Sequence, residues 1–306
     1  MSRVTLLSGG VGGARAARGF AAILDPADLV VVVNVGDDDR IHGVQVSADL
    51  DTVVYTLAGR AGPHGWGLAD DTFETMDRLQ DLGVETTFRI GDADLATCLA
   101  RTIALDAGDL LSAITARIAG HLGVAHTVLP VTDDPVRTRL RTTDGRWLAF
   151  QDYFVMRSQR DEVATVRFEG AETASPAPGV LAAITDADLV VIAPSNPPLS
   201  VWPILAVPGV RDAVARSARV AAISPLFGGK ALRGPADRVM ASLGLPSGNA
   251  GVLAAYEGLL SDLVVDDADA GDLVALGGSV TLHATDTRIP SRDDAARLAS
   301  FIMGLT

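Results

Sequence analysis

The stretch VTLLSGGVGGAR, residues 4–15, is the clearest indication of the fold. A β-prone apolar run ends at four glycines, and a helical pattern then continues through Phe20 and Ile23. A second run, LVVVVNV at residues 29–35, is apolar without alternation, as expected of a strand buried on both faces. A strand, a glycine turn, a helix and a strand are the usual opening of a doubly wound α/β sheet.

The same order of elements returns later in the chain. Residues 189–193 and 220–223 are short apolar runs, each followed by a turn rich in proline and glycine. Between the two halves lies a helical region, residues 61–123. We therefore predict a single domain over residues 1–306, with a mostly parallel Rossmann-like core formed by residues 1–60 and 124–306. The helical insertion forms a smaller lobe.

Local signals place the remaining elements. Asp71 and Glu74 have the spacing of a capping box for a helix over residues 71–82, and a second helix begins at Asp92. That second helix carries three apolar residues at four-residue spacing, which predicts one apolar face: Leu95, Leu99 and Ile103. The pair Asp144-Gly145 predicts a hairpin turn. The spacing of Ser291 and Asp294 predicts a cap for a last helix that ends near Met303.

The composition excludes several classes of protein. With 48% hydrophobic and 21% charged residues, 306 residues can bury a large core. A net charge of −13 argues against nucleic acid as a partner. The single Cys98 excludes an intramolecular disulfide, and we expect it to be a packed helix thiol. No apolar run approaches the length of a membrane span, and Arg3 is followed closely by the glycine loop. We expect a cytoplasmic protein.

The glycine loop is the first candidate site. Its glycines let the backbone approach a phosphate, and the helix that follows points its N-terminus at the same place. Arg15 is placed to reach back to an anion. We predict phosphate binding by Gly10, Gly12, Gly13 and Arg15, and the alternative is a tight turn that serves packing. The loop does not identify the nucleotide.

The second candidate site is acidic. Asp37 and Asp38 follow the second strand, and Asp49 and Asp51 follow shortly after. Carboxylates at the carboxyl end of a central strand lie where open α/β sheets bind ligands, and such hard oxygen ligands suit Mg²⁺. We predict Mg²⁺ binding by Asp37, Asp38 and Asp49. The alternative is a solvated loop with a helix cap at Asp49.

Two further loops follow the later strands. Ser195 and Asn196, held between prolines, suit a phosphate or a base edge, although a proline-rich turn alone would explain them. Lys230 follows two glycines, which predicts an anion nest beside a point charge. Lys230 is the one lysine among 25 basic residues, which makes a solvated surface lysine less convincing here.

Together these motifs resemble the 2-phospho-L-lactate transferase (CofD-like) family of deazaflavin coenzyme F-420 biosynthesis. The resemblance covers essentially the whole chain. Its first half rests on residues 9–15, 34–38, 49–52, 91–97 and 129–135, and its second half on residues 193–197, 203–205, 224–225 and 234–236. The chain departs from the family pattern at Ala93 and Cys98, where relatives commonly have arginine and histidine.

The resemblance implies a reaction. The terminal ribityl hydroxyl of 7,8-didemethyl-8-hydroxy-5-deazariboflavin (Fo) attacks the phosphorus that bears an organic acid in a diphospho-5'-guanosine donor, and GMP leaves. By the same resemblance Asp51 is catalytic and contacts the deazaflavin together with Arg89, and both lie outside the core. The later loops bind the guanosine diphosphate part, and the protein is a homodimer. A GC-rich bacterial composition favours an enolpyruvyl over a lactyl or glyceryl donor.

Two alternatives remain at the level of sequence. One is a non-enzymatic CofD-like regulator of cell-wall metabolism that binds a sugar nucleotide. Such a regulator would keep the glycine loop but would have no reason to keep Asp51 with Arg89. The other is a nicotinamide-dependent oxidoreductase, which would need a cleaner glycine fingerprint and one acidic residue about 20 positions further on.

Overall fold

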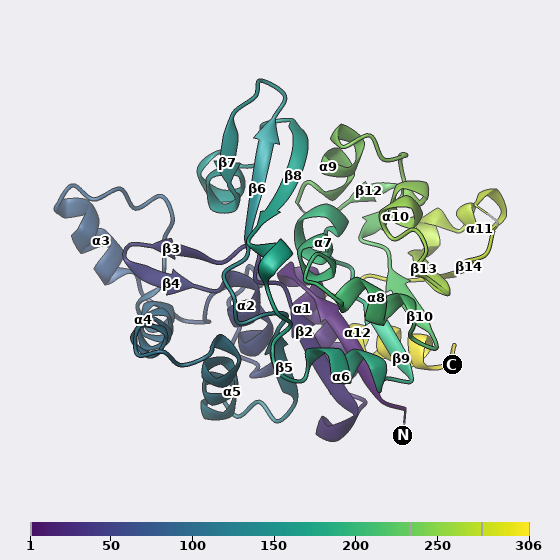
Figure 1. Ribbon diagram of the computed structural model, residues 1–306, viewed down its shortest axis with the longest axis horizontal. Helices are drawn as coiled ribbons and strands as arrows, with labels where there is room; N and C mark the ends of the chain where they lie inside the picture. Colours follow the sequence, from purple (N-terminus) through teal and green to yellow (C-terminus); the bar gives the residue numbers. More distant parts are fainter. Residues whose placement is uncertain (1, 233, 277, 306) are drawn as a thin grey trace.

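The centre of the protein is a seven-stranded parallel sheet in the order β14-β13-β10-β9-β1-β2-β5 (Figure 1). The computed structural model describes residues 2–232, 234–276 and 278–305. The strands of this sheet are β1 (Val4–Ser8), β2 (Leu29–Val33), β5 (Thr127–Pro130), β9 (Leu189–Ile192), β10 (Val220–Ile223), β13 (Asp262–Asp266) and β14 (Thr281–Thr285). Because the inner strands are covered on both faces, β1, β9, β10 and β13 are buried along their whole length.

Helices cover the two faces of the sheet. Against one face pack α12 (Arg292–Met303), α1 (Gly10–Ala21), α2 (Ala48–Leu57) and α5 (Leu111–His121). The shorter helices α6 (Val180–Thr185), α7 (Trp202–Leu205) and α8 (Val210–Ala215) form a second group, in contact with one another. Three more short helices lie in the C-terminal half: α9 (Ala236–Ser242), α10 (Asn249–Ala255) and α11 (Asp272–Ala275). The doubly wound, Rossmann-like fold is confirmed.

The chain reverses its winding direction beside β1. From β1 it proceeds outward to β2 and β5, and it then returns to the other side of β1 to build β9, β10, β13 and β14. The pairing register aligns Ser8 with Val33, and Leu7 with Ile192. The loops after β1, β2 and β9 therefore leave the sheet at the same edge, and this switch point is where open α/β sheets bind ligands.

Smaller sheets stand beyond the carboxyl edge. One is the hairpin of β3 (Asp39–Ile41) and β4 (Val44–Val46), and another is the hairpin of β11 (Leu226–Phe227) and β12 (Lys230–Ala231). A third sheet combines β7 (Trp147–Ala149), β6 (Arg137–Thr142) and β8 (Val163–Glu169), antiparallel (Figure 1). Its β6–β7 turn contains Asp144-Gly145, with Gly145 at φ +89°, as predicted. The capping box of Ser291 and Asp294 also forms at the start of α12.

Residues 61–123 contain α3 (Glu74–Asp81), α4 (Asp92–Asp106) and α5. A separate apolar cluster joins this region to the β3–β4 hairpin. It consists of Val44, Val46, Met76, Ile90 and Cys98. Cys98 is a buried free thiol, as expected. Within the described ranges, no helix is both long enough and apolar enough to cross a membrane.

The predicted capping box of Asp71 and Glu74 is wrong. Helix α3 begins at Glu74 without a side-chain cap from its own N-terminus. The carboxylate of Asp71 instead accepts hydrogen bonds from two amides that open α4, those of Ala93 (2.8 Å) and Asp94 (3.0 Å). Asp92 in turn accepts from two amides that open α3, those of Glu74 (2.9 Å) and Thr75 (3.0 Å). The two helices begin side by side, so each is capped from the other.

The predicted apolar face of α4 is wrong at two of its three residues. Leu95 packs against the apolar cluster, but Leu99 and Ile103 are 48% and 62% exposed. Cys98 and Arg101, on another face of the helix, are buried. Periodicity alone assigns the apolar stripe to the interior. Here a buried ion pair, described below, takes the inward face instead.

Candidate active site

The candidate site lies at the carboxyl edge of the sheet, around the loops that follow β1, β2 and β9. The glycine loop is tied to both neighbouring loops by hydrogen bonds. The amide of Gly10 donates to Asp49 Oδ1 (2.8 Å), and Ser195 Oγ donates to the carbonyl of Gly9 (2.7 Å). The structure therefore brings the first three predicted sites together.

Each glycine of the loop has its own steric reason. Gly10 has φ +65°, a conformation that side chains rarely adopt. A Cβ on Gly12 would lie 2.4 Å from the carbonyl oxygen of Pro194, and one on Gly13 would lie 2.5 Å from Ser8 Oγ. Close packing thus explains Gly12 and Gly13 without a ligand, and phosphate binding by this loop stays a prediction. Arg15, half-buried, lies on α1 just beyond these glycines.

The loop after β9 supports the glycine loop. Ser195 is 3% exposed, and its hydroxyl also accepts a hydrogen bond from the amide of Gly9 (3.2 Å). The amide oxygen of Asn196 caps the turn that follows, accepting from the amide of Leu199 (3.3 Å). Both side chains hold the backbone in place beside α1.

Asn34 links the acidic loop to Asp49. Its amide group donates to Asp49 Oδ2 (2.9 Å), and its oxygen accepts from the amide of Gly36 (2.7 Å). Both carboxylate oxygens of Asp49 are therefore occupied, one by Asn34 and the other by Gly10. Asp49 lies in the first turn of α2 and holds α1, α2 and the end of β2 in one unit.

Asp37 and Asp38 differ from Asp49. They are 4% and 2% exposed, and Oδ1 of each has no hydrogen-bond partner among the described residues. Asp38 Oδ2 accepts from Ser47 Oγ (2.7 Å), and the backbone carbonyl of Asp37 accepts from Gln151 Nε2 (2.8 Å). Leaving a buried carboxylate oxygen unsatisfied costs free energy, and a ligand that contacts these two oxygens would reduce that cost.

The electrostatics of this cluster follow from burial. Burial, with the neighbouring Asp49 and Asp38 adding to it, raises the pKa of Asp37 well above its ordinary value. Burial also raises the pKa of Asp38 to about 7, although Ser47 and Arg137 lower it in part. Carboxylates that share a desolvated site resist ionising together, and a divalent cation would relieve that cost. Carboxylate oxygens are the ligand type that Mg²⁺ prefers, and Mg²⁺ binding by Asp37, Asp38 and Asp49 stays a prediction.

Asp51 is paired with Arg101. The guanidinium of Arg101 donates to Asp51 Oδ1 in an ion pair whose side chains are only 2% and 9% exposed. Burial raises the pKa of Asp51, and Arg101 opposes that shift. The expectation that Asp51 lies outside the core is wrong, because the first turn of α2 is covered by α4.

Arg89 lies elsewhere in the helical region. Its guanidinium forms an ion pair with Asp77 (2.5 Å) and stacks over the ring of Phe73, 5.1 Å from the ring centroid. The side chain is 39% exposed. The ion pairs of the structure thus join Asp51 to Arg101 and Arg89 to Asp77. A shared role for Asp51 and Arg89 toward one ligand stays a prediction.

Lys230 is exposed in the β11–β12 hairpin. The glycines at the turn have φ +58° and +74°, which suits a backbone nest. The amide of Gly228 donates to the carboxylate of Asp269 (2.9 Å), so an internal carboxylate occupies that donor. The anion-binding role of Lys230 is a prediction that rests on its side chain.

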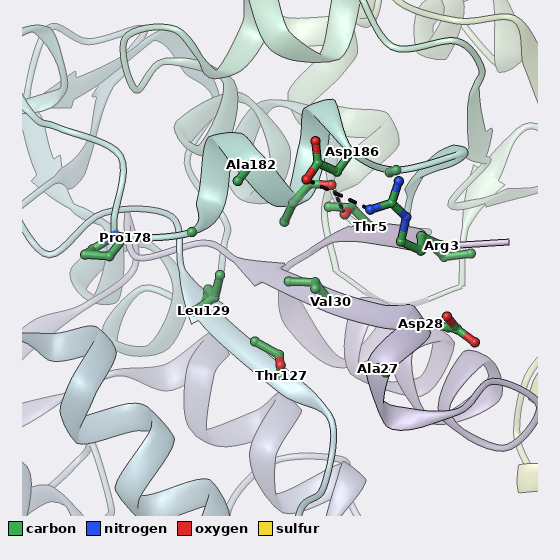
Figure 2. Close-up of a pocket in the computed structure, with 14 residues that line it drawn as sticks. Arg3, Thr5, Ala27, Asp28, Val30, Thr127, Leu129, Pro178, Ala182 and Asp186 are labelled. Atoms are coloured by element: carbon green, nitrogen blue, oxygen red, sulfur yellow. Dashed lines mark hydrogen bonds and ion pairs between the residues drawn. The ribbon is translucent and has the colours of Figure 1, made fainter. Parts of the chain in front are cut away.

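A hollow of about 390 Å³ lies at the opposite edge of the sheet (Figure 2). Residues at the amino ends of β1, β2 and β5 line it together with α6, among them Arg3, Val30, Leu129 and Asp186. Arg3 and Asp186 form an ion pair across 3.9 Å. The hollow is lined largely by apolar atoms and is separated from the carboxylate cluster by the length of the strands. It does not belong to the candidate site.

Several residues of the site were not predicted from the sequence: Asn34, Ser47, Tyr55, Asp94, Arg101 and Gln151. For Asp94 and Arg101 a signal existed, because Asp94, Cys98 and Arg101 recur at helical spacing and form a polar stripe on α4. Such a stripe usually faces solvent. No local pattern identifies Gln151, because Asp37, whose carbonyl it hydrogen-bonds, lies 114 positions earlier in the chain. The two residues meet only in the folded protein.

The chain is similar to known proteins along most of its length. The chain matches the family model described as 2-phospho-L-lactate transferase CofD over residues 4–276. It is 43% identical over 276 residues to a phosphoenolpyruvate transferase of Streptomyces griseus, covering 88% of this chain and 87% of that protein. It is 36% identical over 302 residues to a 2-phospho-L-lactate transferase of Methanosarcina acetivorans, covering 98% of each.

A solved structure is similar in fold. It is a member of the UPF0052 family from Bacillus halodurans, with a TM-score of 0.66 and 18% sequence identity over 99% of both chains. At this identity the likeness concerns the fold alone. It supports the Rossmann-like arrangement described above.

Proposed function

The chain belongs to the 2-phospho-L-lactate transferase (CofD) family and is a transferase, and we propose that it acts in coenzyme F-420 biosynthesis on Fo. It moves a phospho-organic acid from a diphospho-5'-guanosine donor to the ribityl hydroxyl of Fo, with release of GMP. The observation that carries the proposal is the pair of buried, unpartnered carboxylate oxygens of Asp37 and Asp38 at the switch point. They lie in the loop after β2, next to the glycine loop.

The bond changes are simple. The ribityl oxygen forms a new bond to the phosphorus that bears the organic acid, the bond from that phosphorus to the GMP phosphate oxygen breaks, and the hydroxyl proton is released. Such a transfer needs alignment and charge neutralisation more than a covalent nucleophile. We therefore expect no covalent enzyme intermediate.

Asp37 and Asp38, with Asp49 as their support, would hold Mg²⁺. When bound, the ion supplies neutralisation of the negative charge on the donor's phosphates. The protein's own part is to fix these carboxylates: Ser47 orients Asp38, Gln151 holds the backbone of Asp37, and Asn34 orients Asp49.

The organic groups of the two substrates are assigned to opposite sides of this cluster. The donor's guanosine diphosphate lies along the loops after β1, β9 and β10, with Gly10, Gly12, Gly13, Arg15, Ser195, Asn196 and Lys230 on its side. Fo lies on the side of the helical lobe, toward Asp51 and Arg89. This division follows the strand order, in which β9 and β10 stand on one side of β1, and β2 on the other.

The donor we favour carries an enolpyruvyl group. The 43% identity to a protein named phosphoenolpyruvate transferase exceeds the 36% identity to one named 2-phospho-L-lactate transferase. Lactyl and glyceryl donors are the competitors. By the family resemblance we further propose a cytoplasmic homodimer.

The test is a transfer assay of the purified protein with Fo, Mg²⁺ and each of the three donors. GMP release and the mass of the deazaflavin product are measured together. We expect transfer, fastest from the enolpyruvyl donor. A protein that binds a sugar nucleotide and shows neither Fo binding by fluorescence nor GMP release would instead be a regulator.

A further inference from the structure

Arg101 is a deeply buried basic side chain beside the candidate site. It projects from the inward face of α4 and is 2% exposed, while the apolar Leu99 and Ile103 of the same helix face outward. Burying an arginine while exposing a leucine and an isoleucine is unfavourable unless polar contacts of the guanidinium compensate for its burial. Arg101 makes such contacts.

The guanidinium is held on two sides. One nitrogen donates to Asp51 Oδ1 and another donates to the backbone carbonyl of Gln45 on β4 (3.3 Å). The next residue of α4 completes the link, because Thr102 Oγ1 accepts from the amide of Gln45 (2.7 Å). Asp51 is thereby joined to both α4 and the β3–β4 hairpin.

The same guanidinium compensates more than one carboxylate. Burial raises the pKa values of Asp38, Asp51 and Asp94, and Arg101 opposes each of these shifts. The hydroxyl of Tyr55, one turn after Asp51 on α2, donates to Asp94 Oδ1 on α4 (2.8 Å). Two polar contacts thus join α2 to α4, one through Arg101 and one through Tyr55.

A metal ion is a poor alternative at this point. Ligand atoms of Asp51, Asp94 and Cys98 lie within 4.8 Å of one another. However, the guanidinium already pairs with Asp51, and burial raises the pKa of the Cys98 thiol, so the thiolate that a metal prefers is disfavoured. The cation that this cluster uses is Arg101.

We propose that Arg101 is a positioning residue: it fixes the carboxylate of Asp51 in the orientation that meets the acceptor, and so makes α4 part of the acceptor site. This inference rests on the proposed function, since Asp51 meets the acceptor only if the transfer takes place. Arg101 acts through Asp51 and touches no substrate.

The test is a double-mutant cycle with Arg101→Met and Asp51→Asn, read as kcat/KM for Fo and as KM for the donor. We expect Arg101→Met to lower kcat/KM for Fo by roughly 10- to 100-fold, as for groups that orient a site residue. The donor KM should change by less than about threefold, because Arg101 makes no hydrogen bond to Asp37 or Asp38, the carboxylates assigned to the donor's metal ion. In the Asp51→Asn protein, Arg101→Met should add less than about a threefold loss, since the two residues act as one unit.

Conservative and control variants separate positioning from structure. Arg101→Lys keeps the charge but offers a point contact in place of the fork, so it should recover only part of kcat/KM for Fo. If Arg101→Met does not fold, Arg101→Lys carries the same comparison. The matched control is Arg117→Met on α5, whose ion pair with Asp109 (3.2 Å) is exposed and which should transfer like the wild type.

Two results overturn the inference. One is wild-type kcat/KM for Fo in both Arg101 variants, and the other is a loss that multiplies fully with that of Asp51→Asn. A wild-type protein that transfers to Fo from no donor overturns the proposed function first, and that outcome is seen before any variant is made.

Discussion

Asp262 at the amino edge of the central sheet differs from Asp37 and Asp38 at the carboxyl edge, although all three are buried. At the amino end of β13, Asp262 accepts two hydrogen bonds from Arg219 (2.7 and 3.0 Å) and one from His283 (2.8 Å). Burial alone would raise its pKa, but these partners outweigh it, and the pKa is lowered. At the carboxyl edge, Asp37 and Asp38 each keep one oxygen without a partner, and burial raises both pKa values.

The difference separates a structural carboxylate from a binding one. Asp262, Asp37 and Asp38 are all aspartates, and all three are almost fully buried. A folded chain normally pairs its buried charges, because an unpaired one costs several kcal/mol. Asp262 follows that rule, and its contacts contribute stability. Asp37 and Asp38 do not follow it, and a ligand bound at the switch point would supply the missing partner.

The largest effect is expected when metal is withheld. If Asp37 and Asp38 lack only a cation, EDTA should reduce transfer by at least about 100-fold, and Mg²⁺ or Mn²⁺ should restore it. Mg²⁺ should also raise the thermal midpoint of the wild type but not that of Asp37→Asn. Full activity in the chelator would show that the two oxygens need no metal.

Replacing Asp51 and Arg89 tests the acceptor side of the carboxyl edge. Losing a charged partner at a desolvated site costs about 2 to 5 kcal/mol, or roughly 30- to several-thousand-fold in rate. We expect Asp51→Asn to reach this range and Arg89→Ala to lose at least about tenfold. Asp51→Asn should also lower the thermal midpoint, because it leaves Arg101 buried and unpaired, whereas Arg89→Ala should not. Wild-type transfer in both variants would place the acceptor elsewhere.

Asp262 tests the amino edge. Asp262→Asn should destabilise the fold by about 3 kcal/mol near neutral pH, because it leaves Arg219 and His283 unpaired, and should leave transfer unchanged. The pKa of Asp262 is lowered on folding, so its contribution is present above the unfolded value and is lost as the pH falls through the folded one. Denaturant unfolding at several pH values measures both the loss of stability and its dependence on pH. A loss of transfer in a folded Asp262→Asn protein would contradict the division between the edges.

Replacing Asp38 should change the free energy of unfolding in the opposite direction from replacing Asp262. Its pKa is raised to about 7, so without metal its burial costs stability increasingly as the pH rises from about 4 to 7. The pKa shift corresponds to a free-energy cost of at most about 4 kcal/mol for ionised, buried Asp38. Water entry and structural relaxation reduce this cost. We therefore expect Asp38→Asn to stabilise the metal-free protein by about 2 kcal/mol at pH 8. The gain should disappear near pH 4. A destabilised Asp38→Asn protein at pH 8 would contradict this prediction.

Lys230 gives the smallest effect, because its side chain is exposed. Lys230→Ala should raise the donor KM by about fivefold and leave Fo binding unchanged, in keeping with one screened charge contact. Lys230→Arg should also raise the donor KM if the hairpin requires a point charge. A Lys230→Arg protein that behaves like the wild type would show that the single lysine is accidental.

The sequence predicted those features that depend on neighbours along the chain. The glycine loop, the buried strands, the hairpin at Asp144-Gly145 and the cap at Ser291 all form as expected. The errors share a cause: they concern groups whose partners come from distant elements. Asp71 caps α4 in place of α3, and Asp51 pairs with Arg101 fifty positions away. Local patterns do not show which of two competing partners a carboxylate will meet.

The doubly wound sheet and the edge at which polar groups collect could be predicted from local patterns, because strand burial and glycine turns are local properties that a parallel sheet places at one edge. Which carboxylates are satisfied could be seen only in the folded protein. Asp49 is saturated by Gly10 and Asn34, whereas Asp37 and Asp38 retain unpartnered oxygens. The free energy of a buried charge depends on every group around it, and those groups come together only when the chain has folded.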